Sequence, residues 1–273
     1  MTNEKTTIGQ LLAAVGSDLH LDCELLLAKV FDQSRSFIYM FPELILTKSQ
    51  IDRFHQLWMR RLQGEPLAYL LGYKEFWGLN FKVNQHTLIP RPETETIVEY
   101  VLSNYVNEDY SLLDVGTGSG AIACAIANER PNWKLTATDI SFDSLAIAKM
   151  NAKQLGLSNI QFLQGDTFNP VKERQYDIIV SNPPYIAGTD PHLTHLQYEP
   201  REALVASDHG MAVLKSLIAN AANYLSHEGI LIVEHGYDQL NAVNQFSATT
   251  DLHNISILHD LAGIARACVF KKI

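Results

Sequence analysis

Apolar residues in the first seventy positions recur every three or four residues, the spacing of helices that bury one face. Gly64 and Gly72 are the predicted stops. The apolar positions are Leu11, Leu12 and Val15, then Leu21, Leu25, Leu26 and Val30, then Ile51, Phe54, Leu57, Trp58 and Leu62. The pattern predicts a compact helical bundle over residues 1–73. It is either a scaffold or, as we favour, a docking surface for a macromolecular substrate.

The period then changes from about four to two. Apolar Trp77, Leu79, Phe81 and Val83 alternate with polar residues or glycine, which indicates a strand buried on one face. Thr87–Ile89 is the expected antiparallel partner. We therefore predict a β-hairpin linker over residues 74–90, followed by a catalytic domain over residues 91–273.

From Ser111 onward, short apolar runs alternate with helical stretches such as Ala121–Asn128 and Ser144–Leu155. This alternation predicts an α/β fold with a doubly wound parallel sheet. Two short final runs are joined by too few residues for a crossover helix, so they predict an antiparallel pair at one side. The seven strand candidates are Leu112–Val115, Leu135–Asp139, Ile160–Leu163, Ile178–Ser181, Ile230–Glu234, Ile255–Leu258 and Ala267–Phe270.

Composition narrows the class of protein. The chain has 273 residues, of which 47% are hydrophobic, and a net charge of −9, which disfavours a direct nucleic-acid partner. Its polar first residues and lack of a long apolar run predict a cytoplasmic protein without a membrane span. Its three scattered cysteines and its histidines, His192 and His195 included, show no metal-ligand pattern, so no metal is expected. We expect a monomer.

The first chemical motif is the glycine-rich turn at residues 114–121, between a strand and a helix. Glycines allow a ligand to approach the backbone there, and Asp139 at the end of the next strand can accept both ribose hydroxyls. Gly116, Gly118 and Ala121 also satisfy the relaxed dinucleotide fingerprint, so this motif alone leaves a dehydrogenase open.

The second motif, Asn182-Pro183-Pro184-Tyr185, follows a predicted buried strand. The prolines stiffen the loop, and Asn182 should face the same cleft as the glycine turn. The Asn182 side chain and the Pro183 carbonyl offer two fixed acceptors for an NH₂ group, and Tyr185 can pack on its flat face. This arrangement predicts a planar nitrogen as the substrate.

Together these motifs resemble class I S-adenosylmethionine-dependent methyltransferases that act on planar nitrogens, either adenine N6 or glutamine N5. Four further segments, residues 88–95, 198–204, 234–239 and 260–266, resemble the release-factor glutamine methyltransferases, the PrmC or HemK family. The resemblance covers nearly the whole chain. It implies an enzyme that methylates the Gly-Gly-Gln glutamine of peptide chain release factors and leaves S-adenosylhomocysteine.

The resemblance also implies residue roles. Asn182, Pro183 and Tyr185 are the expected catalytic residues, and Asn182 to Tyr185, Pro184 included, would grip the substrate amide. Members of the family often have Trp after the Asp that ends the third strand, whereas Thr167 follows Asp166 here. Phe168, or the Thr167 backbone, is the expected substitute beside adenine. The expected cofactor-binding residues are Gly116, Thr117, Gly118, Ser119, Gly120, Asp139, Asp166, Thr167 and Asn182.

Two other interpretations stay open. A nucleic-acid adenine methyltransferase would want a basic groove, and a non-catalytic binding protein would have no need for the Asn182 loop. Arg91, Glu93 and Glu95 have an equally good interpretation as an ordinary helix start. His235 has no predicted catalytic role, and Glu234 is interpreted as a possible strand end.

Overall fold

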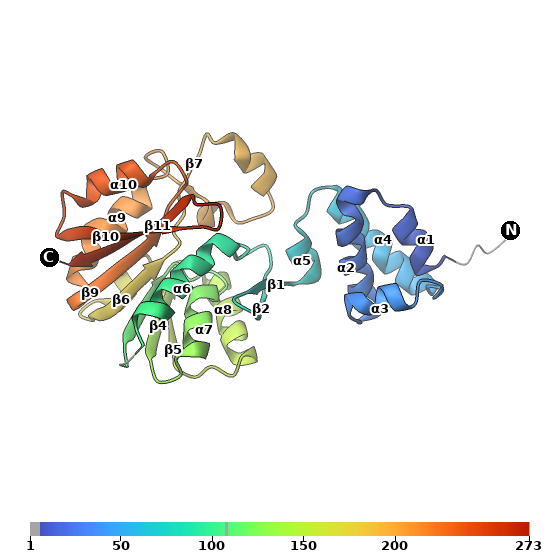
Figure 1. Ribbon diagram of the computed structural model, residues 1–273, viewed down its shortest axis with the longest axis horizontal. Helices are drawn as coiled ribbons and strands as arrows, with labels where there is room; N and C mark the ends of the chain where they lie inside the picture. The colour runs from blue at the N-terminus through green and yellow to red at the C-terminus, as the bar shows by residue number, and fades with distance from the viewer. Residues whose placement is uncertain (1–5, 107–108, 273) are drawn as a thin grey trace. The chain divides into compact units, whose positions relative to one another are not determined.

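The computed structural model describes residues 6–106 and 109–272, and it divides into two compact units, Met1–Tyr73 and Lys74–Ile273. The smaller unit is helical, and Figure 1 shows α2 running among α1, α3 and α4. Its elements are α1 (Ile8–Ala13), a 3₁₀ turn (Ser17–Leu19), α2 (His20–Phe31), α3 (Arg35–Met40), α4 (Lys48–Leu62) and α5 (Leu67–Leu71).

Local sequence signals set the ends of these helices. Thr7 and Thr47 each cap a helix whose third residue, Gln10 or Gln50, bonds back to the cap, so both α1 and α4 begin with a capping box. Gly72 ends α5 with a φ of 81°, a conformation that favours glycine. The predicted helical bundle and its stop at Gly72 are therefore confirmed.

Where the units join in sequence, β1 (Tyr73–Phe76) and β2 (Leu79–Lys82) form a two-stranded hairpin. The prediction that Trp77 lies in a strand paired with Thr87–Ile89 is wrong. Trp77 and Gly78 instead make the turn, with φ values of 52° and 69°. The alternation of apolar residues continued through the turn, which concealed it. Phe76 and Phe81 are almost fully buried and contribute to the core of the larger unit.

The larger unit contains a seven-stranded sheet in the order β10-β11-β9-β6-β3-β4-β5. All neighbouring strands pair in parallel except β11, which is antiparallel to both β9 and β10. The predicted doubly wound sheet with its antiparallel final strand is confirmed. The strands are β3 (Ser111–Val115), β4 (Lys134–Asp139), β5 (Ile160–Gln164), β6 (Tyr176–Ser181), β9 (Leu225–Glu234), β10 (Leu252–His259) and β11 (Ala265–Lys272).

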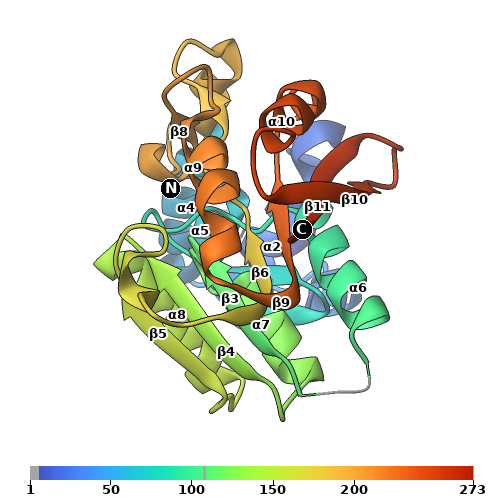
Figure 2. The same ribbon diagram turned by 90° about the vertical axis from the view of Figure 1, so that its left-hand side faces the viewer.

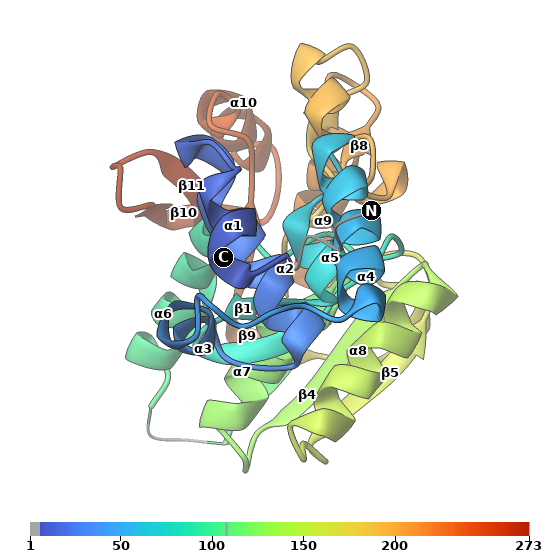
Figure 3. The ribbon, with the colours of Figure 1, turned by 90° about the vertical axis from the view of Figure 1, so that its right-hand side faces the viewer.

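Helices cover both faces of this sheet (Figure 2). One face packs against α6, α7 and α8, and α8 runs beside β4 and β5 in Figure 3. The other face packs against α9 and α10. The helices are α6 (Glu95–Asn104), α7 (Ala121–Glu129), α8 (Phe142–Gln154), α9 (Ala212–Asn220) and α10 (Leu240–Ser247).

The remaining elements are short and belong to the loops. Two two-residue strands, β7 (Ile186–Ala187) and β8 (Val205–Ala206), pair with each other. The 3₁₀ turns of the larger unit are Pro92–Thr94, Asn169–Val171, Pro191–Leu196, Arg201–Ala203 and Ala221–Asn223. Within the described ranges, no helix is long and apolar enough to cross a membrane.

Candidate active site

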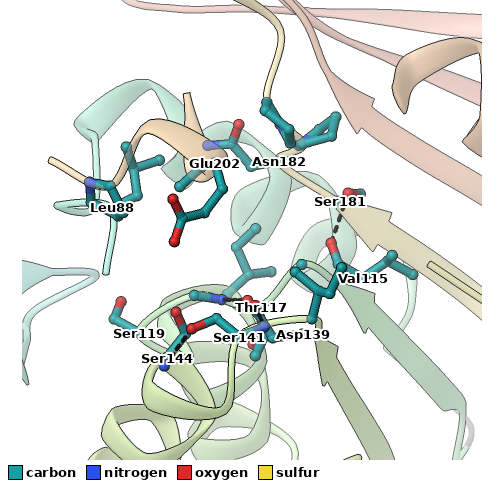
Figure 4. Close-up of a pocket in the computed structure, with 18 of the residues that line it drawn as sticks. Leu88, Val115, Thr117, Ser119, Asp139, Ser141, Ser144, Ser181, Asn182 and Glu202 are labelled. Atoms are coloured by element: carbon teal, nitrogen blue, oxygen red, sulfur yellow. Dashed lines mark hydrogen bonds between the residues drawn. The ribbon is translucent and has the colours of Figure 1, made fainter. Parts of the chain in front are cut away.

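A cavity of about 350 Å³ lies at the carboxyl ends of β3, β4 and β6. The chain runs from β3 to β4 on one side and returns to β6 on the other, so this is the point where the strand order reverses, the usual ligand crevice of such sheets. Figure 4 shows Asn182 across the cavity from Ser119 and Asp139. The predicted site residues that line it are Gly116, Thr117, Gly118, Ser119, Asp139, Asp166, Thr167, Asn182, Pro183 and Pro184.

The glycine-rich turn forms one wall. The amides of Gly116 and Thr117 donate to the Thr138 carbonyl, which ties the turn to β4. Gly116 and Gly118 have positive φ values, and a methyl group built on either would meet no atom within 4 Å. The wall therefore offers bare backbone and open space. Gly120 does not line the cavity; a methyl group there would lie 3.1 Å from the Ala148 Cβ.

Two carboxylates support this turn. Asp139 accepts from the amides of Gly118 and Ser141, at 2.8 and 2.9 Å, and burial raises its pKa. Asp114, at the end of β3, is fully buried and accepts from the Thr117 hydroxyl at 2.6 Å. Burial raises the pKa of Asp114 to about 7, against the lowering effect of its hydrogen bonds from Thr117 and Ala123. Within residues 6–106 and 109–272, its Oδ1 has no hydrogen-bond partner.

Asn182 stands at the end of β6, where the Ser181 hydroxyl anchors the strand by donating to the Val115 carbonyl at 2.7 Å. The Asn182 Nδ2 donates to the Thr94 hydroxyl oxygen at 3.1 Å. Its Oδ1 is buried and has no hydrogen-bond partner among the residues that the structure describes. An unpaired buried acceptor is costly unless a ligand completes it. The side chain thus presents an acceptor to the cavity that it lines.

Tyr185 lies differently from its predicted place, because it does not line the cavity. Its hydroxyl donates to the Glu234 Oε1 at 3.1 Å, and its carbonyl accepts from Gln239 at 2.9 Å. Burial raises the pKa of this phenol, with the Glu234 charge as the next cause. Gly210 packs so closely that a methyl group on it would lie 2.1 Å from the Tyr185 carbonyl oxygen. The loop is therefore held from behind as well as by its prolines.

The neighbouring residues Thr167 and Phe168 have different surroundings. Thr167 lines the cavity with a φ of 43°. Phe168 is buried in the core and stacks on Tyr224, with ring centroids 4.4 Å apart. Of the two candidates for the wall beside adenine, only Thr167 therefore has access to the cavity.

Glu234, which the sequence suggested only as a strand end, is central to this region. It is 2% exposed and accepts from the hydroxyls of Thr94 (2.6 Å) and Tyr185. Burial raises the pKa of Glu234 to about 7, although both hydrogen bonds lower it. Thr94 and Glu234 are 140 residues apart, and their only sequence signal was that each lies in a segment of family resemblance.

Comparison with known proteins also indicates a methyltransferase. Residues 94–199 match the methyltransferase small domain, and residues 7–72 match the PrmC N-terminal domain. A "release factor glutamine methyltransferase" from Coxiella burnetii is 45% identical, covering 97% of this chain and 96% of that protein. A protein of the same name from Aliivibrio fischeri is 42% identical over 93% of this chain and 91% of its own length. The chain belongs to the release factor glutamine methyltransferase family.

The solved structures agree in fold. A methyltransferase from Pyrococcus furiosus superimposes with a TM-score of 0.55 at 19% identity, covering 80% of this chain and 98% of that one.

Residues 88–95 and 198–204, two of the segments that resemble the family, are in contact in the structure. Glu199, 7% exposed, accepts from the Ile89 amide at 3.0 Å and from Arg91. In this member of the family, one buried carboxylate thus joins two segments that border the cavity.

In residues 6–106 and 109–272, no group of three or more His, Cys, Asp or Glu side chains is placed to hold a metal ion.

Proposed function

We propose that this chain transfers a methyl group from S-adenosylmethionine to the side-chain amide nitrogen, N5, of the glutamine in the Gly-Gly-Gln motif of peptide chain release factors. The observation that carries the proposal is the buried, unpaired Asn182 Oδ1 at the cavity. A primary amide has two N–H donors, so this oxygen and the Pro183 carbonyl suit it as a pair of acceptors.

The residues of the cavity fit the cofactor. Gly116 and Gly118 leave open space for its methionine part, Asp139 suits the ribose, and Thr167 and Asp166 suit the adenine end. Among the lining side chains, Asp139, Asp166 and Glu202 are acidic and Arg91 is basic. An excess of carboxylates favours a cationic sulfonium over a dinucleotide with its two negative phosphates. When bound, S-adenosylmethionine supplies a methyl group on a sulfonium, which is left as a neutral thioether.

Residues of the chain activate the substrate amide nitrogen, which is a weak nucleophile. An amide nitrogen shares its lone pair with its carbonyl and is a poor nucleophile as it stands. Asn182 and Pro183 accept the two N–H bonds, which orients the nitrogen and increases its electron density. Both acceptors also favour the positive charge that develops on nitrogen as the methyl arrives. The nitrogen then releases one proton to water, which leaves a neutral methylated amide, and no side chain of the cavity needs to act as a dedicated base.

The rest of the proposal concerns the surroundings of this reaction. Residues 1–73 dock the release factor, residues 74–90 link the domains, and residues 91–273 carry the chemistry. The enzyme acts in the cytoplasm as a monomer, without a metal and without direct contact with nucleic acid. The net charge of −9 supports the last point, since phosphate backbones are repelled by such a surface.

Mass spectrometry of a release factor incubated with the enzyme and isotope-labelled S-adenosylmethionine tests the proposal. We expect one labelled methyl group on the Gly-Gly-Gln glutamine. A release factor with asparagine at that position should remain unlabelled. Label that appears on an adenine-containing oligonucleotide, and not on the release factor, would contradict the proposed substrate.

A further inference from the structure

The Asn182 side chain has two faces that differ in chemistry, and a methyltransferase of this kind needs one of them. Oδ1 accepts hydrogen bonds, whereas Nδ2 donates them. If the amide were turned over, two donors would face the two donors of the substrate NH₂ group, and the contact would become repulsive. Something in the protein must therefore fix the direction of this side chain.

Thr94 fixes it through the single proton on its hydroxyl. When Glu234 is ionised, that proton is donated to its Oε2 at 2.6 Å, since an ionised carboxylate only accepts. Toward Asn182, 3.1 Å away, the same hydroxyl has only lone pairs left to offer. The atom of Asn182 that faces Thr94 must then be the donor, Nδ2, and Oδ1 is left for the cavity.

Hydrogen bonds to both of its oxygens fix the Glu234 carboxylate in place. Its other oxygen, Oε1, accepts from the Tyr185 hydroxyl at 3.1 Å, so both oxygens are occupied by donors. Thr94 belongs to the 3₁₀ turn Pro92–Thr94 before α6, Asn182 follows β6, and Glu234 ends β9. Three separate elements thus converge on one chain of hydrogen bonds that ends at the cavity.

We infer that Thr94 and Glu234 are positioning residues for methyl transfer: the Glu234 carboxylate orients the Thr94 hydroxyl, which holds the Asn182 amide with its oxygen toward the substrate nitrogen. This inference rests on the proposed function. Thr94 lines the cavity and Glu234 does not, and both act on the transfer step through Asn182.

The test is single-turnover methylation of a release factor by the full chain at pH 8, above the Glu234 pKa of about 7, with steady-state kinetics and cofactor calorimetry beside it. Thr94→Val keeps the shape of the side chain and removes the hydroxyl. Partners that orient a primary contact, measured at metal sites, typically contribute about 10–100-fold. We expect a loss of that size in the transfer rate, with KM and cofactor Kd within about twofold of the parent.

Three further variants separate positioning from simple structural support. Thr94→Ser restores the hydroxyl and should restore the rate to within about threefold of the parent. Glu234→Gln can donate to Thr94, which frees the Thr94 proton for Asn182 and turns the amide; its loss should match that of Thr94→Val. Thr96→Val is the matched control, since the Thr96 hydroxyl only donates to the Glu93 carbonyl, at 2.7 Å, and it should transfer at the parent rate.

A parent enzyme that does not label the release factor overturns the proposed function itself. An active parent with equally fast Thr94→Val and Glu234→Gln variants overturns the positioning role and leaves the proposed function intact. A rise in KM at constant kcat would also overturn it, since orientation of the amide acts on the chemical step. If Thr94→Val does not fold by circular dichroism, Glu234→Gln decides by the same criterion.

Discussion

The small helical unit and the larger unit each bury a glutamate almost completely, and they hold it in opposite ways. Glu24 in α2 is 1% exposed and receives hydrogen bonds from Arg35, Tyr39 and His20. Burial raises the pKa of Glu24, but the bonds from Tyr39 and Arg35 outweigh it and leave the pKa below its ordinary value. Glu234 has two neutral hydroxyls as partners, and burial raises its pKa to about 7.

The difference extends to the unpaired atoms. Four buried side-chain polar atoms of the described residues have no partner, and all four belong to the larger unit. Two of them, the Asn182 Oδ1 and the Asp114 Oδ1, lie at the cavity or directly beneath its glycine turn. Within residues 6–73, no buried side-chain polar atom lacks a partner. The larger unit keeps some unsatisfied where a ligand is to bind.

The largest expected effect concerns the unpaired oxygen. Asn182→Ala removes this acceptor and leaves both prolines, so the loop should keep its shape. Loss of one preorganised group of this kind typically costs about 10²–10³ in rate. Single-turnover methylation of a release factor measures it, with circular dichroism and cofactor binding as controls. Asn104→Ala removes only a bond to the Tyr100 carbonyl and should transfer at the parent rate. A parent-like rate in Asn182→Ala would remove the amide grip.

The second prediction concerns how the free energy of unfolding depends on pH through Glu234. The folded pKa of Glu234, about 7, lies above the ordinary 4.5, so the folded chain holds this proton more tightly than the unfolded chain does. Its contribution is present below pH 4.5 and is lost as pH rises to about 7. By linkage the loss is roughly 3 kcal/mol. The charged groups that act on Glu234 are Glu93, which raises its pKa, and Arg266, which lowers it.

Urea unfolding of the full chain between pH 4.5 and 8 measures this slope. Glu234→Gln should flatten it, although Asp114 contributes a slope of the same sign. Methyl transfer should move in the opposite direction, because a protonated Glu234 can donate to Thr94 and no longer fixes its proton. An identical slope in parent and variant would contradict this prediction, since it would mean that the pKa of Glu234 is the same in the folded and the unfolded chain.

The third prediction concerns the ribose acid. Asp139→Ala should weaken S-adenosylmethionine binding by about 1.5–3 kcal/mol, the range for hydrogen bonds to a charged group. Calorimetry measures it. Asp143→Ala, four residues along in α8 and outside the cavity, is the matched control and should bind normally. Equal affinity in Asp139→Ala would take Asp139 out of the ribose site.

The smallest effect belongs to the helical unit. Glu24→Gln keeps an acceptor but loses the charge, so its bonds from Arg35 and Tyr39 weaken by about 1–2 kcal/mol in total. Faster hydrogen exchange in peptides from α2 and α3 should report this. Because the folded pKa of Glu24 is lowered, its contribution is present above its ordinary pKa and is lost as pH falls. The cofactor Kd should not change; a change would show that Glu24 serves more than the fold.

The sequence anticipated most of the sheet and the catalytic turn because both are local. Strand ends carry Asp139 and Asn182 to one edge of a parallel sheet, and a glycine turn at residues 116–120 precedes a helix. All the predicted site residues except Gly120 and Tyr185 accordingly line one cavity, while their roles stay predictions. Contacts between residues far apart in the sequence could not be predicted from it. The sequence around Thr94 does not predict its contact with Glu234. The sequence around Tyr185 does not predict that its hydroxyl points to that carboxylate and not into the cavity.

Side-chain direction was the other weak point. Phe168 and Thr167 are neighbours, and only packing against Tyr224 decides which of them faces the cavity. The hairpin error had a similar cause, since Trp77 and Gly78 kept the two-residue alternation while their positive φ values turned the chain. Period alone does not reveal such turns when an aromatic residue occupies one of the turn positions.

The position of β11 has a consequence for how the protein is made. This strand is the last of the sheet in sequence, yet it lies between β9 and β10 and is paired on both sides. While the chain is being synthesised, β9 therefore has no neighbour on that side until residues 265–272 emerge from the ribosome. Glu234, the final residue of β9, pairs across to Ala267. Emerging chains are thus expected to carry an open sheet edge, a point where association with other chains competes with folding.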